Sequence, residues 1–223
     1  MTQWMEFDRA DDVALAVADT IAESSIQAIR QRGTFKIVLA GGTTPLTSYQ
    51  LLAGRALDFE HWQVFYGDER CLPEHDPQRN HRLVAGTGLS ERVGRHFIIP
   101  AQLGPEKGAE SYAHTVNTAV PFDLVLLGMG EDGHTASLFP ALDWERKRTS
   151  ARVIPVHGAP KPPPQRISLS LSCLQDCRQM MVIVTGQGKR SAVQQWRQGV
   201  LLPVAQVSAV SQATVFIERG LLS

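Results

Sequence analysis

The feature that most constrains this chain is a short apolar run that ends in a charged, glycine-rich turn, within residues 122–140. Residues 124–127, LVLL, lie between Pro121 and Gly128 and are too few for a helix, so they are typical of a strand buried on both faces. The glycines of the following GMGEDGH segment allow a sharp turn and a close approach to a ligand. In an open α/β sheet, ligands bind beyond the carboxyl ends of the strands. We therefore expect an α/β fold that keeps its chemistry at this turn.

Three side chains of the turn, Glu131, Asp132 and His134, can titrate or accept hydrogen bonds. A lone histidine is more often structural, but the glycines, the acids and the preceding buried strand favour a functional one here. The three glycines also loosely match a dinucleotide-binding fingerprint, which needs an acid at the end of a second strand about 20 residues further on. Asp143 follows no strand pattern, so a nicotinamide site is not expected.

The rest of the chain alternates helical and strand patterns. Apolar residues at helical spacing predict a helix that is capped by Asp11 or Asp12 and ends at Gly33. Other strands are predicted at 35–40, 63–67, 152–156 and 180–185, with a last, edge strand at 214–217, and residues 166–174 alternate apolar and polar. Other helices are predicted near 80–85, 105–116 and 191–198. Residues 143–150 are expected to be charged and exposed. The alternation argues for a mainly parallel sheet covered by helices on both faces.

A second glycine turn, AGGTTP at residues 40–45, follows the strand predicted at 35–40. Thr43 or Thr44 can cap a helix whose first residue is Pro45. A helix that opens after glycines presents free N–H groups and the positive end of its dipole, so this turn, with Gly42, suits a phosphate. It is not a P-loop, because GxxxxGK[ST] is absent. An ordinary strand–helix turn explains the segment equally well.

Two further predicted strands end in charged residues. The DER segment at 68–70 is either a solvated rim or part of a site, and its arginine suits bidentate binding of a phosphate or carboxylate. The GQGK segment at 186–189 places Lys189 at the start of a helix, which is unfavourable unless an anion is near, although an exposed lysine is the simpler explanation. His75, Asp76 and His81 match no metal-ligand spacing and are expected to be solvated loop residues.

The composition excludes several classes of function. The 22 basic and 22 acidic residues balance, so no net field favours nucleic acid or a membrane surface. No apolar run is long enough to cross a bilayer, and the N-terminal segment lacks an apolar signal core. Cys71, Cys173 and Cys177 form neither a disulfide framework nor a CxxC pair. A cytoplasmic location is the simplest expectation.

Five segments, in this order, closely resemble 6-phosphogluconolactonase: AGGTTP, FYGDERCLP, LGMGEDGHTASLFP, RISLS and TGQGK. The resemblance covers residues 14 to about 215, and GEDGHTASLFP is its most specific part. It implies a Rossmann-like α/β fold in a single domain, residues 1–223. It also implies hydrolysis of 6-phospho-D-glucono-1,5-lactone to 6-phospho-D-gluconate in the oxidative pentose phosphate pathway, with no metal or organic cofactor. The broader group includes glucosamine-6-phosphate deaminase and ribose-5-phosphate isomerase.

The chemistry of a lactone suits the residues of the central turn. Opening the ester requires an activated water molecule and stabilisation of the oxyanion. His134 is the natural general base, because an unperturbed pKa of roughly 6.5 leaves it mostly neutral at pH 7. Asp132 or Glu131 could orient the imidazole, and the resemblance favours Asp132. Arg70 or backbone N–H groups of the glycine turn would meet the oxyanion.

The residues expected to bind the substrate come from the other turns. The phosphate is expected to lie against the threonine turn, and the resemblance implies two further phosphate contacts and two residues lining the sugar pocket. The set is Gly42, Thr43, Thr44, Arg166 and Lys189 for the phosphate, and Asp68 and Asn80 for the sugar. The sequence carries no signal for the oligomeric state.

Two alternative functions remain. Glucosamine-6-phosphate deaminases resemble this chain at the DGH turn but continue GHIAFNEP, with a glutamate of the ring-opening relay five positions after the histidine. Phe139 occupies that position here and has no proton to exchange. A sugar-phosphate-binding module without catalysis is the other alternative, since a fold does not decide function. Such a module would keep the phosphate-binding residues but would not need His134 or Asp132.

Overall fold

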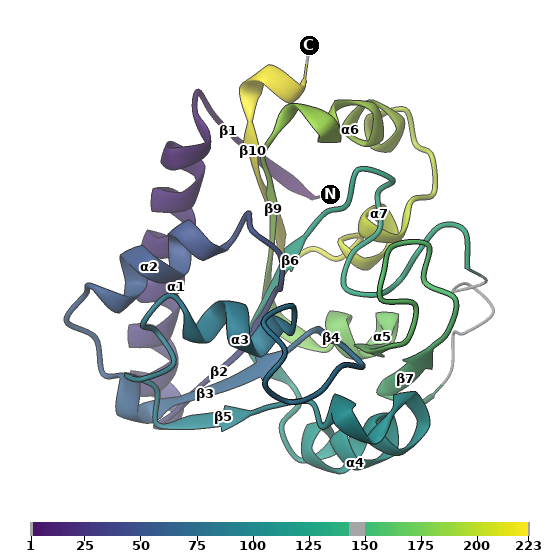
Figure 1. Ribbon diagram of the computed structural model, residues 1–223. Helices are drawn as coiled ribbons and strands as arrows, with labels where there is room; N and C mark the ends of the chain where they lie inside the picture. The colour runs from purple at the N-terminus through teal and green to yellow at the C-terminus, as the bar shows by residue number, and fades with distance from the viewer. Residues whose placement is uncertain (1, 143–149, 223) are drawn as a thin grey trace.

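The computed structural model describes residues 2–142 and 150–222. Its centre is a seven-stranded sheet in the order β1-β10-β9-β6-β2-β3-β5, in which every neighbouring pair is parallel (Figure 1). The strands are β1 (Gln3–Phe7), β2 (Phe35–Leu39), β3 (Trp62–Tyr66), β5 (Arg95–Phe97), β6 (Phe122–Gly128), β9 (Cys177–Val184) and β10 (Ala213–Glu218). The predicted α/β class with a mainly parallel sheet is therefore confirmed.

The middle strand, β6, is the apolar run from which the sequence analysis began. Every residue from Phe122 to Leu127 is buried, and only Gly128 at its end is partly exposed. Strands β9 and β2 pair with its two edges, and apolar side chains cover both its faces, as the absence of alternation predicted. The turn after β6 therefore starts from a strand that is buried on both faces, which holds the turn in place.

Helices lie on both sides of this sheet. They are α1 (Ala10–Arg32), α2 (Leu46–Ala53), α3 (Asn80–Ala85), α4 (Pro105–Asn117), α5 (Leu171–Gln175), α6 (Arg190–Arg197) and α7 (Pro203–Val207). Figure 1 shows α1 and α2 on one side, and α4, α5 and α7 on the other. Helix α1 ends at Gly33 as predicted, and the φ of 75° at this residue explains why glycine stands there.

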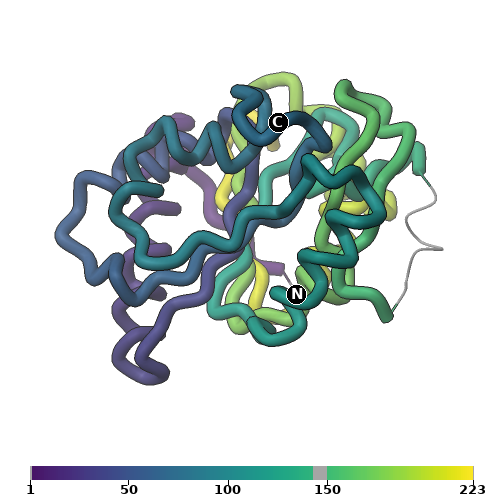
Figure 2. The backbone as a smooth tube through the Cα atoms, turned by 60° about the horizontal axis from the view of Figure 1, so that its bottom comes forward, coloured from purple at the N-terminus to yellow at the C-terminus, as the bar shows by residue number. Residues whose placement is uncertain are grey.

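A small antiparallel sheet, absent from the predictions, is built from β4 (Asp68–Arg70), β8 (Arg166–Leu169) and β7 (Val153–Val156), in the order β4-β8-β7. The pairing sets Arg70 opposite Arg166 and Asp68 opposite Ser168. Figure 2 shows the green segment that carries β7 and β8 beside the teal segment that carries α4. This sheet brings the DER and RISLS segments together, although about 95 residues separate them in sequence.

Some predicted details are wrong. Strand β10 is not an edge strand, because β1 pairs along it from Gln3 to Phe7. The pattern of β1 did not reveal it, since its residues are mostly exposed and do not alternate. Neither Asp11 nor Asp12 caps α1; Arg9 is the N-cap residue and makes no side-chain cap hydrogen bond.

The start of α2 also differs from the prediction. The helix begins at Leu46 with Pro45 as its N-cap residue, so neither Thr43 nor Thr44 caps it. Most of the segment predicted to be charged and exposed, residues 143–149, lies outside the described residues.

Candidate active site

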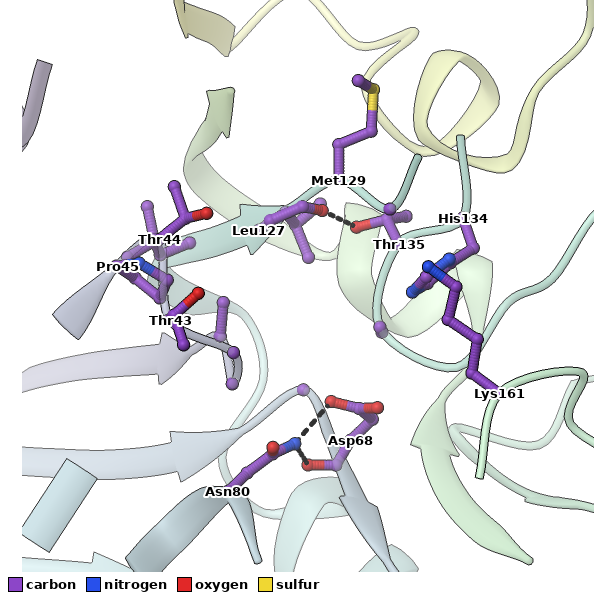
Figure 3. Close-up of a pocket in the computed structure, with 18 of the residues that line it drawn as sticks. Thr43, Thr44, Pro45, Asp68, Asn80, Leu127, Met129, His134, Thr135 and Lys161 are labelled. Atoms are coloured by element: carbon purple, nitrogen blue, oxygen red, sulfur yellow. Dashed lines mark hydrogen bonds between the residues drawn. The ribbon is translucent and has the colours of Figure 1, made fainter. Parts of the chain in front are cut away.

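The carboxyl ends of β2, β3, β6 and β9 open onto one cavity of about 300 Å³. This is the edge at which an open parallel sheet binds its ligands. All of the residues predicted for the site, except Asp132, line the cavity: Gly42, Thr43, Thr44, Asp68, Arg70, Asn80, His134, Arg166 and Lys189. Figure 3 shows three walls, with Thr43 and Thr44 on one, Asp68 and Asn80 on another, and His134 and Lys161 on the third.

Asp132 lies next to the cavity and holds the imidazole of His134. Its Oδ1 atom lies 2.5 Å from Nδ1 of His134 and 3.3 Å from the backbone nitrogen of the same residue. The loop closes on itself, because Gly130 N–H donates to His134 O (2.8 Å) and Gly133 N–H donates to Gly130 O (3.0 Å). Since Nδ1 is occupied, Nε2 is the ring nitrogen available to the cavity.

The glycines of this turn leave room for the Asp132–His134 pair. A Cβ atom at Gly130 would overlap the imidazole of His134 and the carboxylate of Asp132, and Gly133 has a φ of 80°. On its other side the imidazole packs against Phe139, with ring centroids 4.5 Å apart. The ring of His134 is therefore fixed by a carboxylate at Nδ1 and by an aromatic face.

The pKa of Asp132 reflects this pair. Partial burial by itself would raise the pKa, but the hydrogen bond from His134 and the charge of its imidazolium outweigh burial and lower the value to about 2. Asp132 is thus a carboxylate at any physiological pH. A fixed negative charge at Nδ1 keeps the proton on that nitrogen and leaves Nε2 unprotonated in the neutral ring.

Glu131, the other acid considered for orienting the imidazole, points elsewhere. Its Oε2 atom lies 4.0 Å from Nζ of Lys161, and its side chain is so close to Gly188 that a Cβ there would lie 2.6 Å from Oε1. Glu131 therefore bridges the turn after β6, the GQGK turn and the proline loop, GAPKPPP at residues 158–164. Asp132 alone orients His134.

One wall of the cavity is a network around the carboxylate of Asp68. Asn80 Nδ2 donates to Asp68 O and to Asp68 Oδ1, both at 2.9 Å, and Ser137 Oγ donates to Asp68 Oδ2 at 2.6 Å. These contacts fix the orientation of the Asn80 amide, because a flipped amide would set Oδ1 against two acceptors. Asn80 Oδ1 is buried and has no hydrogen-bond partner within residues 2–142 and 150–222.

Glu69, the middle residue of DER, is fully buried and holds this wall. Its carboxylate accepts from the backbone nitrogens of Arg70 (2.8 Å), Asn80 (2.6 Å) and His81 (3.1 Å), and its Oε2 lies 3.1 Å from Nδ1 of His81. Arg79 Nε lies 3.5 Å from the same oxygen. Burial alone would raise the pKa of Glu69, but these hydrogen bonds outweigh it and lower the pKa.

The role of Glu69 was missed in the sequence, and the expectation that His81 is solvated is wrong. His81 is only 7% exposed, because Glu69 accepts from its ring as α3 begins. Nothing in the spacing of DER and NHR indicated that the two segments meet. Of the three loop residues expected to be solvated, His75 is exposed, as predicted.

Arg166 lines the cavity, but most of its hydrogen-bond donors are directed to carbonyl groups of the proline loop. Its Nε donates to Pro163 O at 3.1 Å, and its Nη2 donates to Lys161 O at 3.0 Å and Pro162 O at 3.3 Å. Its remaining nitrogen, Nη1, lies 3.8 Å from Asp68 Oδ2, and the guanidinium carbon lies 5.4 Å from the ring centroid of Phe139. Arg166 therefore links the proline loop to the sheet.

Arg70 is the second arginine of the wall. Its Nη1 donates to the carbonyl of Gln78, and its Nε is buried without a hydrogen-bond partner in the described part of the chain. No contact between Arg70 and Asp132 joins the two sides of the cavity there. The arginine is held against the loop before α3 and lines the cavity.

One end of the cavity is cationic. Lys189 lies in the 3₁₀ turn Gln187–Lys189 directly before α6, and both Lys189 and Lys161 line the cavity. Burial lowers the pKa of Lys189, and the positive charge of Lys161 lowers it further. Thr43 and Thr44 stand across from Lys161, beside Gly42, whose φ is 83°. Lys161 was not among the predicted site residues, because the GAPKPPP segment carries no strand or helix pattern.

The described residues contain no group of three or more His, Cys, Asp and Glu side chains that could hold a metal ion. Across residues 2–142 and 150–222, no helix is both long and apolar enough to cross a membrane. The three cysteines are free, as predicted.

The chain belongs to the family of glucosamine-6-phosphate isomerases and 6-phosphogluconolactonases, whose pattern matches residues 8–216. A 6-phosphogluconolactonase from Streptomyces coelicolor is 37% identical over 204 residues, which are 81% of this chain and 77% of that protein. A bifunctional GDH/6PGL endoplasmic protein from Oryctolagus cuniculus is 34% identical over 203 residues. The chain covers only 24% of that rabbit protein, and 64% of a probable chloroplastic 6-phosphogluconolactonase from Oryza sativa.

Solved structures share the whole fold. A 6-phosphogluconolactonase from Shewanella baltica is 28% identical, with a TM-score of 0.86 over 98% of this chain and 97% of that one. A monomeric glucosamine-6-phosphate deaminase is 20% identical, with a TM-score of 0.84 over 99% of each chain. The second likeness concerns the fold alone, so the fold does not separate the two activities and the decision rests on the site.

Proposed function

We propose that this protein is a hydrolase that converts 6-phospho-D-glucono-1,5-lactone to 6-phospho-D-gluconate in the oxidative pentose phosphate pathway. One observation carries the proposal: the oriented imidazole of His134 shares a cavity with Thr43, Thr44 and Lys189. A lactone carbonyl placed at the imidazole can thus have its phosphate at the cationic end. The names of the relatives support the same activity.

His134 is the general base of the proposed mechanism. Its Nε2 takes a proton from a water molecule as the water oxygen attacks the lactone carbonyl carbon, and a tetrahedral oxyanion forms. Asp132 stabilises the imidazolium. The bond between that carbon and the ring oxygen then breaks, and the ring oxygen leaves as a hydroxyl group with the proton returned by His134. A base of this kind typically contributes about 10²–10⁴-fold to the rate.

Arg70 is the cation proposed to stabilise the oxyanion. Its Nη1 is held by Gln78 O, which leaves Nη2 without an assigned partner in the described part of the chain. The backbone N–H groups of the glycine turn are the alternative donors proposed for the oxyanion. Donors that are already fixed stabilise a developing charge without reorganising, and this favours a rigid wall over a mobile one.

The remaining residues bind the substrate. Asp68 and Asn80 face the sugar, and the Asp68 carboxylate accepts from its hydroxyl groups in the proposed complex. Gly42, Thr43, Thr44 and Lys189 meet the phosphate. Arg166 supplies charge to the same end, although its bonds to the proline loop support a structural contribution as well. No metal and no organic cofactor takes part.

The deaminase alternative meets a specific obstacle. The relay of a deaminase needs a titratable side chain at the position of Phe139. That residue is fully buried here, packs on His134 and lies under the guanidinium of Arg166. A phenyl ring cannot exchange a proton, so ring opening of an amino sugar lacks its relay.

We also propose that residues 1–223 form a single domain that acts in the cytoplasm on a small sugar-phosphate lactone, with no nucleic acid partner. The balanced charge and the three free thiols support this proposal.

The decisive experiment is turnover of freshly generated phosphogluconolactone, followed faster than its spontaneous hydrolysis. The wild-type protein should accelerate hydrolysis strongly, and His134→Ala should remove most of the acceleration while affinity for 6-phosphogluconate stays nearly intact. Equal loss of both would mean that the histidine is structural. Intact binding of the phosphorylated product without any turnover by the wild type would restore the non-catalytic alternative.

A further inference from the structure

The loop that carries Lys161 is held in one position over the cavity. Its ends are joined by the hydrogen bond from Ala159 N–H to Pro164 O (3.0 Å). Arg166, itself only 4% exposed, donates to three consecutive carbonyl groups, those of residues 161–163. Prolines that flank the lysine restrict the backbone further. Figure 3 shows the resulting position, with the side chain of Lys161 running from the loop toward His134.

Three cations gather at this end of the cavity. Lys161, Lys189 and Arg166 all line it. Of the acids nearby, Asp132 is bound to His134, and Asp68 accepts from Asn80 and Ser137 and lies 3.8 Å from Nη1 of Arg166. Within residues 2–142 and 150–222, the carboxylate paired with Lys161 is that of Glu131, at 4.0 Å. Two ammonium groups that share a partly buried space repel each other, and an anion between them removes that cost.

We propose that Lys161 is a third cation of the phosphate subsite, which Glu131 neutralises while the subsite is empty and releases when a phosphoryl dianion arrives. The inference rests on the proposed function, because it names a further group of the same site. It assigns the proline loop a role in choosing phosphorylated over unphosphorylated ligands. It also gives Arg166 a second role, as the residue that positions Lys161.

The geometry suits an exchange of partners. The side chains of Lys161 and Glu131 are 46% and 64% exposed, and an exposed ion pair at this separation is worth little. An ammonium group on a flexible stem can turn from a carboxylate to a phosphate without moving the backbone. A dianion placed between Lys161 and Lys189 gains two charge-assisted contacts, which outweighs the loss of one weak pair.

Binding measurements without turnover test the proposal. Titration calorimetry at low ionic strength would compare 6-phospho-D-gluconate, D-gluconate and inorganic phosphate on the wild type and on Lys161→Gln. The matched control is Lys107→Gln, which alters an exposed lysine of α4 away from the cavity. We expect Lys161→Gln to weaken 6-phospho-D-gluconate and phosphate about tenfold and to leave D-gluconate unchanged. Equal weakening of both sugar acids, or no weakening of either, would overturn the proposal.

A double-mutant cycle tests the part played by Glu131. Glu131→Gln removes the competing carboxylate, so it should tighten binding of 6-phospho-D-gluconate about two- to threefold at low salt. The gain should vanish in the Lys161→Gln background, where no ammonium group is left to release. A Glu131→Gln variant that binds phosphate more weakly, or a gain that persists without Lys161, contradicts the exchange.

The outcome is separable from that of the proposed function. If binding is selective for phosphate and depends on Lys161, but the protein does not hydrolyse the lactone, the proposed subsite stands and the proposed lactonase function is wrong. If the protein hydrolyses the lactone rapidly but binding does not change in Lys161→Gln, the lactonase function stands and the proposed subsite is wrong. Melting temperatures of the variants should match the wild type, because both exchanged side chains are largely exposed.

Discussion

The Nδ1 atom of His134 and the Oδ1 atom of Asp132 lie 2.5 Å apart, so the imidazole turns its other nitrogen to the cavity. Only Gly133 separates the two residues in the sequence, and the turn after β6 by itself brings their side chains together. The pair is therefore a local structure, whereas every other wall of the cavity depends on contacts between distant segments.

Asp132→Asn should impair catalysis more than binding. The amide keeps the shape of the carboxylate but loses its charge, so it neither stabilises the imidazolium nor holds the proton on Nδ1. We expect kcat for lactone hydrolysis to fall about 10²-fold and the affinity for 6-phospho-D-gluconate to change little.

The matched control is Asp58→Asn, which alters another aspartate–histidine pair, with His61 Nδ1 2.9 Å from Asp58 Oδ1 on the surface. It should leave kcat unchanged. An Asp132→Asn enzyme with wild-type kcat would show that the carboxylate does not assist the base.

Glu69→Gln should destabilise the protein. The amide can accept hydrogen bonds at one atom only, and its NH₂ group would face the donors of Asn80, His81 or Arg70 in a fully buried site. We expect a loss of about 3 kcal/mol in the free energy of unfolding, measured by urea denaturation. Glu74→Gln, an exposed change in the following loop, is the control and should cost nothing measurable.

The same carboxylate should make stability depend on pH. The pKa of Glu69 is lowered from its ordinary value of 4.5 in the folded protein, so the unfolded chain takes up the proton first. Its contribution is therefore complete above pH 4.5 and is lost as the pH falls through the lowered value. Urea denaturation between pH 7 and pH 3 should show the wild type losing stability more steeply than Glu69→Gln below pH 4.5. Parallel curves would exclude Glu69 as the cause.

Gly130→Ala should abolish the oriented histidine with little effect on the fold. The added methyl group would overlap the His134 ring and the Asp132 carboxylate, and one of the two must leave its position. We expect a fall in kcat at least as large as that of Asp132→Asn, with the melting temperature lowered by a few degrees at most. Gly54→Ala, after α2, meets only Leu51 O at 3.6 Å and should retain full activity.

The parts of the fold that could be predicted are those in which local pattern and burial agree. The apolar run of β6, the glycine after α1 and the glycine turns each indicated an element or its end. The mainly parallel sheet was predicted from the alternation of strands and helices along the chain. The edge strand β1 escaped prediction because most of its residues face solvent. A strand stabilised on one edge by pairing with β10 needs no apolar pattern of its own.

The site shows the same division. His134, Asp132 and the threonine turn stand at strand ends, where an α/β sheet gathers its ligands, so sequence position alone made them candidates. Glu69 and Lys161 could not be selected in this way. Glu69 takes part in the site because the start of α3 donates hydrogen bonds to its carboxylate. Lys161 takes part because Arg166, five residues further on, donates to the carbonyl groups of its loop. Both depend on pairings that one-dimensional spacing does not encode.

Arg166 contacts two parts of the cavity. It donates to the carbonyl groups of the proline loop and lies 3.8 Å from Asp68. Its guanidinium also lies over the ring of Phe139, against which the imidazole of His134 packs. A phosphate bound by Lys161 on this fixed loop is therefore set at a fixed distance from the imidazole that acts on the carbonyl. A sugar acid lactone without a phosphate would then be turned over slowly even at saturation, because the bound phosphate positions the carbonyl at His134 as well as providing affinity.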